Sequence, residues 1–409
     1  MLDRIWTWMF IVALLAALVQ AFVLGNAAVF ADMVGASFES AKTGFEIALG
    51  LTGVMCLWLG LMRLGEKGGA VELLARLTSP LLRRLFPSVP AGHPAEGAIV
   101  MNMASNMLGL DNAATPLGLK AMGEMQKLNP DPDTASDDQI MFLVINASSV
   151  TILPVTIFTY RAQMGAADPT DVFIPILIAT FCSTLTGLLV TAAVQRRRLA
   201  DPVLAAWLGG LTLLVAGTVA VFASLPRETA TAASSVLANA LIFSVMVGFV
   251  VAAARQRVAV YSEFVEGAKD GFKVAIGIVP YLVAMLVAVG VLRASGALDL
   301  ALDGVRAGVG ALGVDARWVD GLPTALMKPL SGSGARGMLI ETMQTHGVDS
   351  FAGRLASVIQ GSTETTFYVL AVYFGSVGIR RTRHAVGCGL AADAAGILAA
   401  IFVSYLFFG

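Results

Sequence analysis

Glu364 is the residue of this chain best placed to do chemistry, because it lies in the middle of a long apolar stretch. A charge at the centre of a bilayer costs roughly 3 kcal/mol on insertion scales, so a glutamate there is typical of a proton carrier, a cation ligand or a substrate contact. Its polar neighbours Thr363 and Thr365 favour a hydrated site. The alternative is a structural ion pair with Lys328 or Arg336.

Asp393 is a second carboxylate inside an apolar stretch, and a second candidate for carrying a coupling ion. The alternative is small-residue packing around a protonated Asp393. A similar polar interruption without an acid lies in the first half of the chain, in the sequence INASSVT. Its candidate substrate contacts are Asn146, Ser148 and Ser149.

The sequence NMASNMLGLDNAATPLGLK breaks an apolar stretch in a way that predicts a hairpin. Thr115 followed by Pro116 is a good N-cap and first helical residue, so we expect the second arm to begin there. A helix that begins deep in the membrane presents its positive dipole end to an anion. Turn formation without a ligand is the alternative. The candidate binding residues are Asn102, Asn106, Asp111 and Asn112.

The sequence LMKPLSGSGARGM predicts a second hairpin, broken by proline and glycine. Lys328 and Arg336 flank the break, while Ser331 and Ser333 can cap the helix that follows. Such a positive tip suits a carboxylate or a phosphate. One alternative is a flexible interfacial loop whose cations snorkel to lipid headgroups. Another is a serine–lysine pair that hydrolyses lipid-linked material.

Membrane-spanning helices must position these residues. A helix needs about 20 apolar residues to cross a bilayer, and the sequence predicts an all-α polytopic membrane protein with nine such helices. Stretches 92–128 and 319–345 are too interrupted to span, and we expect both to be re-entrant hairpins. Segments 70–86 and 296–311 are amphipathic and predict interfacial helices. The nine spans are 5–24, 44–64, 139–160, 171–194, 203–224, 231–254, 274–293, 352–375 and 384–408.

Composition and charge support this reading. Hydrophobic residues make up 57% of the 409 residues and charged residues 13%, whereas soluble domains carry about 25% charged residues. A net charge of −1 argues against a nucleic acid polymer as partner. Arginines gather after the fourth, sixth and eighth spans, and the positive-inside rule makes that side cytoplasmic. We therefore expect a bacterial inner-membrane protein with its N-terminus in the cytoplasm and its C-terminus outside.

An internal repeat divides the chain into halves 1–199 and 200–409. Residues 39–50 and 266–277 are identical at seven of twelve positions. Five spans separate the starts of the two copies, and an odd number predicts that the second copy is inverted. Inverted repeats with discontinuous helices are typical of secondary transporters. A duplication that serves packing alone is the alternative.

The motifs quoted above resemble two known families. The first hairpin and INASSVTILPVTI resemble spore maturation protein A, and the second hairpin and QGSTETTFYVLAVYFGSVGIRRTRHA resemble spore maturation protein B. The chain thus resembles a fusion of A with B. These families are grouped with a nucleoside recognition, or Gate, domain that concentrative nucleoside transporters and the ferrous-iron transporter membrane domain also carry. The resemblance implies a nucleoside-transporter-like fold.

We expect a secondary transporter that carries a small polar solute between the two hairpin tips, coupled to H⁺ or Na⁺. The alternatives are an intramembrane hydrolase and a membrane receptor or scaffold that transports nothing. The sequence contains no Walker loop for ATP. Its three histidines and three cysteines are scattered, so we expect no metal site and no cofactor. A homo-oligomer is compatible with the sequence.

Overall fold

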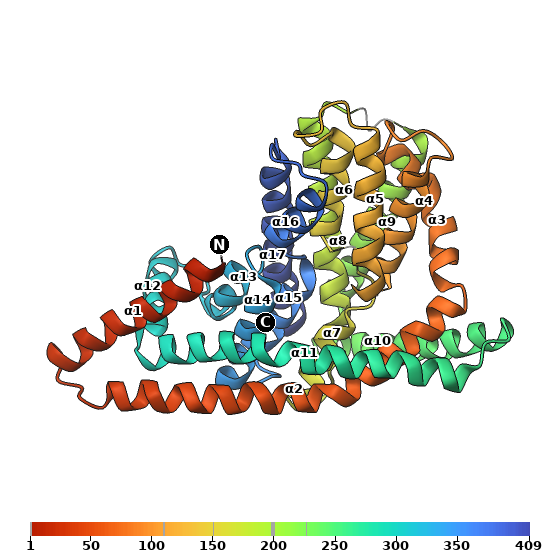
Figure 1. The fold of residues 1–409 in the computed structure, drawn as a ribbon. Helices are drawn as coiled ribbons and strands as arrows, with labels where there is room; N and C mark the ends of the chain where they lie inside the picture. The colour runs from red at the N-terminus through yellow and green to blue at the C-terminus, as the bar shows by residue number, and fades with distance from the viewer. Residues whose placement is uncertain (1, 109–110, 150, 198–200, 226) are drawn as a thin grey trace.

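The computed structural model describes residues 2–108, 111–149, 151–197, 201–225 and 227–409, and its regular elements are helices (Figure 1). Seven helices of the described residues are long and apolar enough to cross a membrane. They are α1 (Leu2–Phe22), α2 (Val29–Lys67), α8 (Phe173–Val194), α9 (Pro202–Ser224), α10 (Arg227–Arg255), α11 (Val260–Ala294) and α17 (Ala385–Phe408). Each overlaps one of the predicted spans, although α2 and α11 begin well before the predicted spans 44–64 and 274–293, and together they confirm an all-α polytopic membrane protein.

Each of the two remaining predicted spans is two shorter helices instead of one. The first is α6 (Asp137–Ala147) followed by α7 (Val155–Gln163), and the second is α15 (Phe351–Ser362) followed by α16 (Thr366–Ser376). In the first break Ser149 has a φ of +56°, which a continuing helix does not allow. Seven of the predicted spans are thus long single helices and two are broken, and the total count of nine membrane-spanning segments stays a prediction.

Both predicted hairpins form. The first joins α4 (Pro94–Met107) to α5 (Asp111–Lys127), and the second joins α13 (Leu322–Met327) to α14 (Gly332–His346). A short 3₁₀ helix, Arg317–Gly321, leads into α13.

The expected start of the first hairpin's second arm at Thr115 is wrong. Helix α5 begins one turn earlier, at Asp111, and Pro116 lies inside it. A proline so near the start of a helix removes few hydrogen bonds, and Asp and Asn are themselves strong helix-starting residues. The sequence pattern therefore allowed more than one start.

The two halves have the same order of elements and opposite directions. The series α2 to α8 corresponds to α11 to α17. Helices α2 and α11 pack side by side along their length (Figure 1). A Cβ on Gly44 would lie 3.1 Å from Val283, and one on Gly60 would lie 2.7 Å from Phe264. Numbers rise along one helix as they fall along the other, so the pair is antiparallel and the repeat is inverted.

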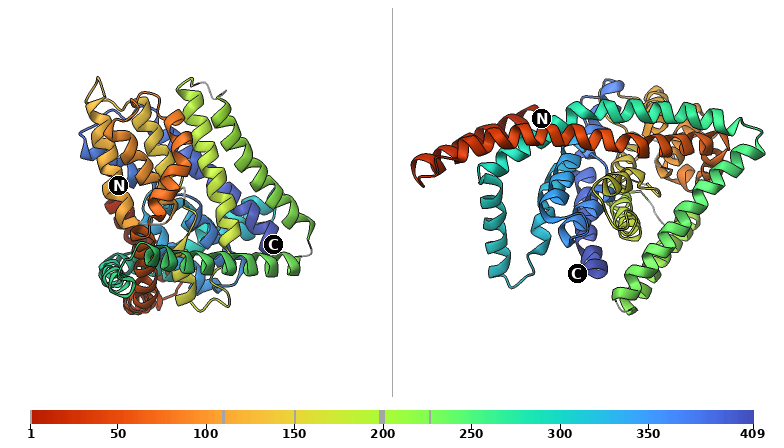
Figure 2. Two further views of the ribbon diagram at one scale, coloured as in Figure 1. Left: turned by 90° about the vertical axis from the view of Figure 1, so that its right-hand side faces the viewer. Right: turned by 90° about the horizontal axis from the view of Figure 1, so that it is seen from below.

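Helices α3 (Ala70–Leu85) and α12 (Ala297–Ala311) follow α2 and α11 directly and lie at opposite ends of that pair (Figure 1). They are the two segments predicted to be interfacial. In the left view of Figure 2, α8 and α9 run as a slanted pair, and α10 lies across their lower ends.

Helices α8 and α17 pack closely at small residues in the centre. A Cβ on Gly187 would lie 3.0 Å from Ala392, and a Cβ on Gly396 would lie 2.5 Å from Thr363 and 3.0 Å from Ser183. Glycine at such contacts lets two membrane helices approach closely. This packing brings Asp393 of α17 next to the break between α15 and α16.

Candidate functional site

The breaks in the two discontinuous helices cross each other. The backbone N–H of Glu364 donates to the carbonyl of Ala147 over 2.8 Å. Helix ends leave backbone groups without partners, and here the opposite repeat supplies one. The crossing therefore joins the two halves at the residues that the sequence singled out.

Each break is also hydrogen-bonded to the end of a hairpin arm. Ile152 N–H donates to the Met107 carbonyl at the end of α4 over 2.8 Å. Phe367 N–H donates to the Pro329 carbonyl just after α13 over 3.1 Å. The same contact thus occurs once in each repeat, so both hairpin tips and both breaks meet in one region.

A cavity of about 60 Å³ lies between the first break and the second hairpin. Four of its lining residues are predicted site residues, namely Ser149, Lys328, Arg336 and Glu364. The structure thus brings together Lys328 just after α13, Arg336 on α14 and Glu364 in the second break. The other lining residues are Thr151, Leu153, Pro154, Val155, Thr156, Ile157, Gly332, Gln360 and Gly361.

The charges of this cavity differ in exposure. Lys328 is only 2% exposed, whereas Glu364 is exposed and Arg336 is half-buried and within hydrogen-bonding reach of the Tyr160 hydroxyl. Taking an ammonium out of water costs several kcal/mol unless anionic or polar groups compensate. Two cations and one carboxylate around a small cavity suit a solute that carries a negative group.

The tip of the second hairpin is a capped helix start. Ser331 is the N-cap of α14, and its Oγ accepts from Gly334 N–H over 3.0 Å. The hydroxyls of Ser331 and Ser333 lie 3.2 Å apart. A Cβ on Gly332 would lie 3.0 Å from the Thr365 Oγ1, so the tip and the second break are closely packed at this glycine. The positive end of the α14 dipole consequently points into this region.

The predicted asparagines form a separate cluster outside the cavity. Asn106 Nδ2 donates to Asn146 Oδ1 over 2.8 Å, and the Tyr373 hydroxyl donates to the same oxygen over 3.2 Å. Asn102 Nδ2 donates to the Ala114 carbonyl over 2.7 Å and so ties the arms of the first hairpin together. The side chains of Asp111 and Asn112 lie outside the described part of the structure.

The buried carboxylate of Asp393 lies next to the second break. Thr366 Oγ1 donates to one carboxylate oxygen of Asp393 over 2.7 Å. Among the described residues, the other carboxylate oxygen and the hydroxyls of Thr363 and Thr365 have no hydrogen-bond partner, although all three residues are at most 2% exposed. Buried polar atoms usually have a partner. On the first repeat's side, Ser148 is satisfied by Thr184 at 3.0 Å.

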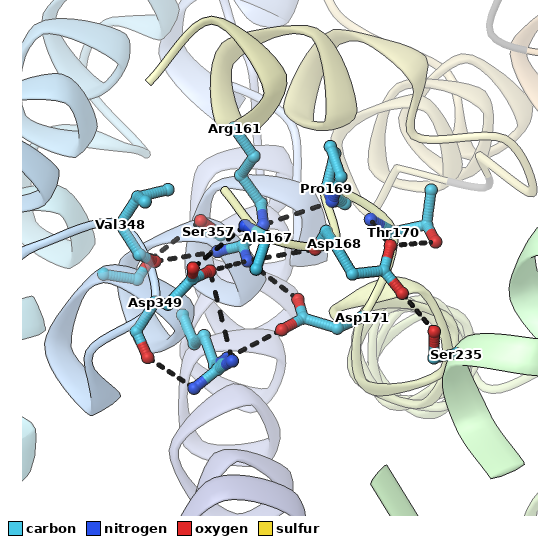
Figure 3. A network of polar contacts seen from close by, with 12 residues as sticks. Arg161, Ala167, Asp168, Pro169, Thr170, Asp171, Ser235, Val348, Asp349 and Ser357 are labelled. Atoms are coloured by element: carbon cyan, nitrogen blue, oxygen red, sulfur yellow. Dashed lines mark hydrogen bonds and ion pairs between the residues drawn. The ribbon is translucent and has the colours of Figure 1, made fainter. Parts of the chain in front are cut away.

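A charged network closes one end of this region (Figure 3). The fully buried Arg161 at the end of α7 lies 2.8 Å from Asp171 and 3.1 Å from Asp349, and it donates to the Val348 carbonyl over 3.0 Å. Arg354 approaches Asp171 to 2.7 Å. We call these four charged side chains the arginine clamp. It joins the loop after α7 to the loop before α15.

The repeat-related loops meet at the other end of the region through the backbone. Arg380 and Arg381 donate their N–H groups to the Asp133 carbonyl over 3.0 and 2.9 Å, and Ala135 N–H donates to the Arg381 carbonyl over 3.0 Å. Arg383 lies 2.8 Å from Asp137. The crossed helices are therefore fastened at both ends, by the arginine clamp at one and by backbone hydrogen bonds and the Arg383–Asp137 ion pair at the other.

The family model for nucleoside recognition, called Gate, matches residues 48–164 and 275–380, more than half of the chain. The chain belongs to the nucleoside recognition (Gate) family. The first Gate match begins inside α2 and the second inside α11, and each contains a hairpin and a discontinuous helix. One matched range thus lies in each half of the chain, while the division at 199/200 stays a prediction.

Two relatives from Bacillus subtilis (strain 168) are similar to parts of this Gate protein. Spore maturation protein B is 46% identical over 173 residues, which cover 42% of this chain and 96% of that protein. Spore maturation protein A is 39% identical over 167 residues, which cover 41% of this chain and 85% of that protein. The predicted resemblance to both is confirmed. The predicted boundary at 199/200 falls outside the described residues.

The crystal structure of the Alcanivorax borkumensis YdaH transporter aligns with 98% of both chains at 16% identity. The TM-score of this alignment is 0.37.

Three residues of the site and its surroundings were not predicted from the sequence. Gln360 lines the cavity and occupies the place that Asn146 has in the first repeat, so the alignment of INASSVT with IQGSTET already pointed to it. Tyr373 lies on an apolar helix and had no such signal. Arg161 directly follows the predicted span 139–160, and nothing near it in sequence indicated its distant partner Asp349.

Proposed function

We propose that this protein is a secondary transporter for a small polar solute with a carboxylate or phosphate group. The observation that carries the proposal is the cavity in which Lys328, Arg336 and Glu364 meet at crossed helix breaks. Glu364 is proposed as the carrier of a coupling ion, H⁺ or Na⁺, with the buried Asp393 as the second candidate. The protein would lie in the bacterial inner membrane with its N-terminus in the cytoplasm.

The size of the cavity bears on how such a protein would work. A volume of about 60 Å³ holds a few water molecules, whereas sites for drug-sized ligands measure roughly 300–1,000 Å³. Solute entry therefore requires the second hairpin to move away from the first break. The hydrogen bond from Phe367 N–H to the Pro329 carbonyl holds the second hairpin to the second break, so we expect this bond to be lost when the hairpin moves.

Uptake into proteoliposomes tests the proposal. Purified protein is reconstituted and offered radiolabelled nucleosides, amino acids, dicarboxylates and sugar phosphates, each with an imposed proton or sodium gradient. We expect gradient-dependent uptake of one anionic or zwitterionic class, and a loss of at least tenfold with Glu364→Gln. Glu46→Gln, at an exposed position on α2, is the matched control and should transport normally. Uptake by Glu364→Gln at the normal rate would remove Glu364 as carrier.

A further inference from the structure

A second and much larger hollow lies away from the proposed transport site. It measures about 1,000 Å³ and lies between α3, the start of α4 and the start of α9. We call it the α3 groove and define it by Arg76, Arg83 and Arg84 on α3, His93 before α4 and Val203 on α9. Its lining is basic: three arginines face a single acid, Glu96, while His93 Nδ1 accepts from Ala95 N–H over 3.2 Å.

These cations are only partly engaged by the protein. Arg83 binds Glu96, which also accepts from Gly92 N–H over 2.8 Å. Arg84 lies 3.6 Å from Asp201, and its side chain is 56% exposed. Arg76 is exposed and has no ion pair among the described residues. Two of the three guanidinium groups are therefore open to an external anion, and guanidinium groups suit phosphate oxygens.

The exposed face of α3 is apolar as well as basic. Val71, Ala75 and Leu82 bury one side of the helix, while Leu73 and Leu77 on another side are 60% and 53% exposed. A basic amphipathic helix with exposed leucines is typical of a helix that lies in the headgroup region of a bilayer. The leucines lie one turn apart, so acyl chains can cover them while a headgroup occupies the groove.

The inverted repeat supplies an internal comparison. Helix α12 has the place in the second half that α3 has in the first, and it also has a largely exposed leucine, Leu300. Its charges differ, because Asp299 and Asp303 outnumber Arg306, and Arg306 binds Asp303 and Asp320. Both repeats therefore have an amphipathic helix at this position. Of the two helices, α3 presents the more basic surface.

We propose that the α3 groove binds the phosphate headgroup of an anionic phospholipid. The arginines give charge complementarity to the phosphate, the volume is far larger than a free phosphate ion needs, and the exposed leucines provide the contact for acyl chains. Basic pockets of this kind at the cytoplasmic side of membrane proteins bind anionic headgroups. The proposal is independent of any transported solute.

Native mass spectrometry of the full-length protein, delipidated in a neutral detergent, tests the proposal. Phosphatidylglycerol should bind at least fivefold more tightly than phosphatidylcholine, and Arg76→Gln/Arg84→Gln should remove that difference. If the double variant does not purify as a monodisperse protein, Arg76→Gln alone at its exposed position should halve the affinity. Arg306→Gln on α12 is the matched control and should leave phosphatidylglycerol binding unchanged.

Two further measurements distinguish a lipid from a free anion. Raising the salt concentration should weaken phosphatidylglycerol binding, because the interaction is between exposed charges. Soluble glycerol 3-phosphate at tenfold excess should not displace the lipid. Equal binding of the two lipids, an unaffected double variant, or full displacement by glycerol 3-phosphate would each overturn the proposal.

Discussion

Replacing Arg161 with methionine tests whether the arginine clamp holds the crossed helices in place. The side chain of Arg161 is fully buried, 2.8 Å from Asp171 and 3.1 Å from Asp349. Removing one member of a buried ion pair costs about 3–5 kcal/mol, because the other charge stays buried without compensation. Asp171 keeps Arg354 at 2.7 Å, so we expect a loss near the lower limit, about 3 kcal/mol in the free energy of unfolding.

The assay is reversible unfolding in mixed micelles of a mild detergent and SDS, followed by circular dichroism. Lys273→Met is the matched control, because Lys273 pairs with Asp270 at 3.2 Å with side chains 75% and 47% exposed. Such an exposed pair contributes at most about 1 kcal/mol. The double variant Arg161→Met/Asp171→Asn should lose less than the two single losses added together, with a coupling of at least about 1 kcal/mol. An Arg161→Met variant as stable as the Lys273→Met control would refute the reasoning.

Three further outcomes are expected from contacts in the same region. Gly396→Val should cost about 1–3 kcal/mol of unfolding free energy, since its Cβ would lie 2.5 Å from Thr363; equal stability of a Gly387→Ala control and Gly396→Val would contradict this. Asn146→Leu should cost about 1–3 kcal/mol because it leaves buried donors unpaired, and more than Tyr373→Phe in the same micelle assay. In the loop before α8, burial raises the pKa of Asp168, but hydrogen bonds from Ser235, Thr170 and Asn239 outweigh it and lower that pKa below its ordinary value. The stability that Asp168 contributes is thus present above about pH 4 and lost as the pH falls through its lowered pKa, and Asp168→Asn should flatten that part of a thermal stability profile.

The membrane-spanning helices were predictable because hydropathy is a local property of the chain. A segment such as Phe173–Val194 is apolar throughout and can only cross a bilayer as a helix. The breaks were harder to predict, since Ser, Thr and Pro are also tolerated inside continuous membrane helices. The alignment of the two copies predicted polar residues at both breaks, but the positive φ of Ser149 does not follow from its residue type.

The candidate site was partly predictable for a related reason. Lys328, Arg336 and Glu364 stand out because charges are rare in apolar stretches, and the structure places all three around one cavity. The asparagines of the first hairpin were predicted as ligand contacts, but Asn102 and Asn106 bond to the protein itself. Sequence alone does not tell a polar group that binds a ligand from one that fastens two helices.

A cysteine cross-link between the two breaks tests the central claim most directly. Ala147 and Glu364 share a backbone hydrogen bond of 2.8 Å, which places their Cα atoms within the span of a disulfide, about 4.4–6.8 Å. In a background without native cysteines, Ala147→Cys/Glu364→Cys should form a disulfide on mild oxidation in membranes. Gly187→Cys/Ala392→Cys, across the α8–α17 pair, is the positive control, because a Cβ on Gly187 would lie 3.0 Å from the Ala392 Cβ. A cross-link in the control together with none between the breaks would contradict the crossing of inverted broken helices.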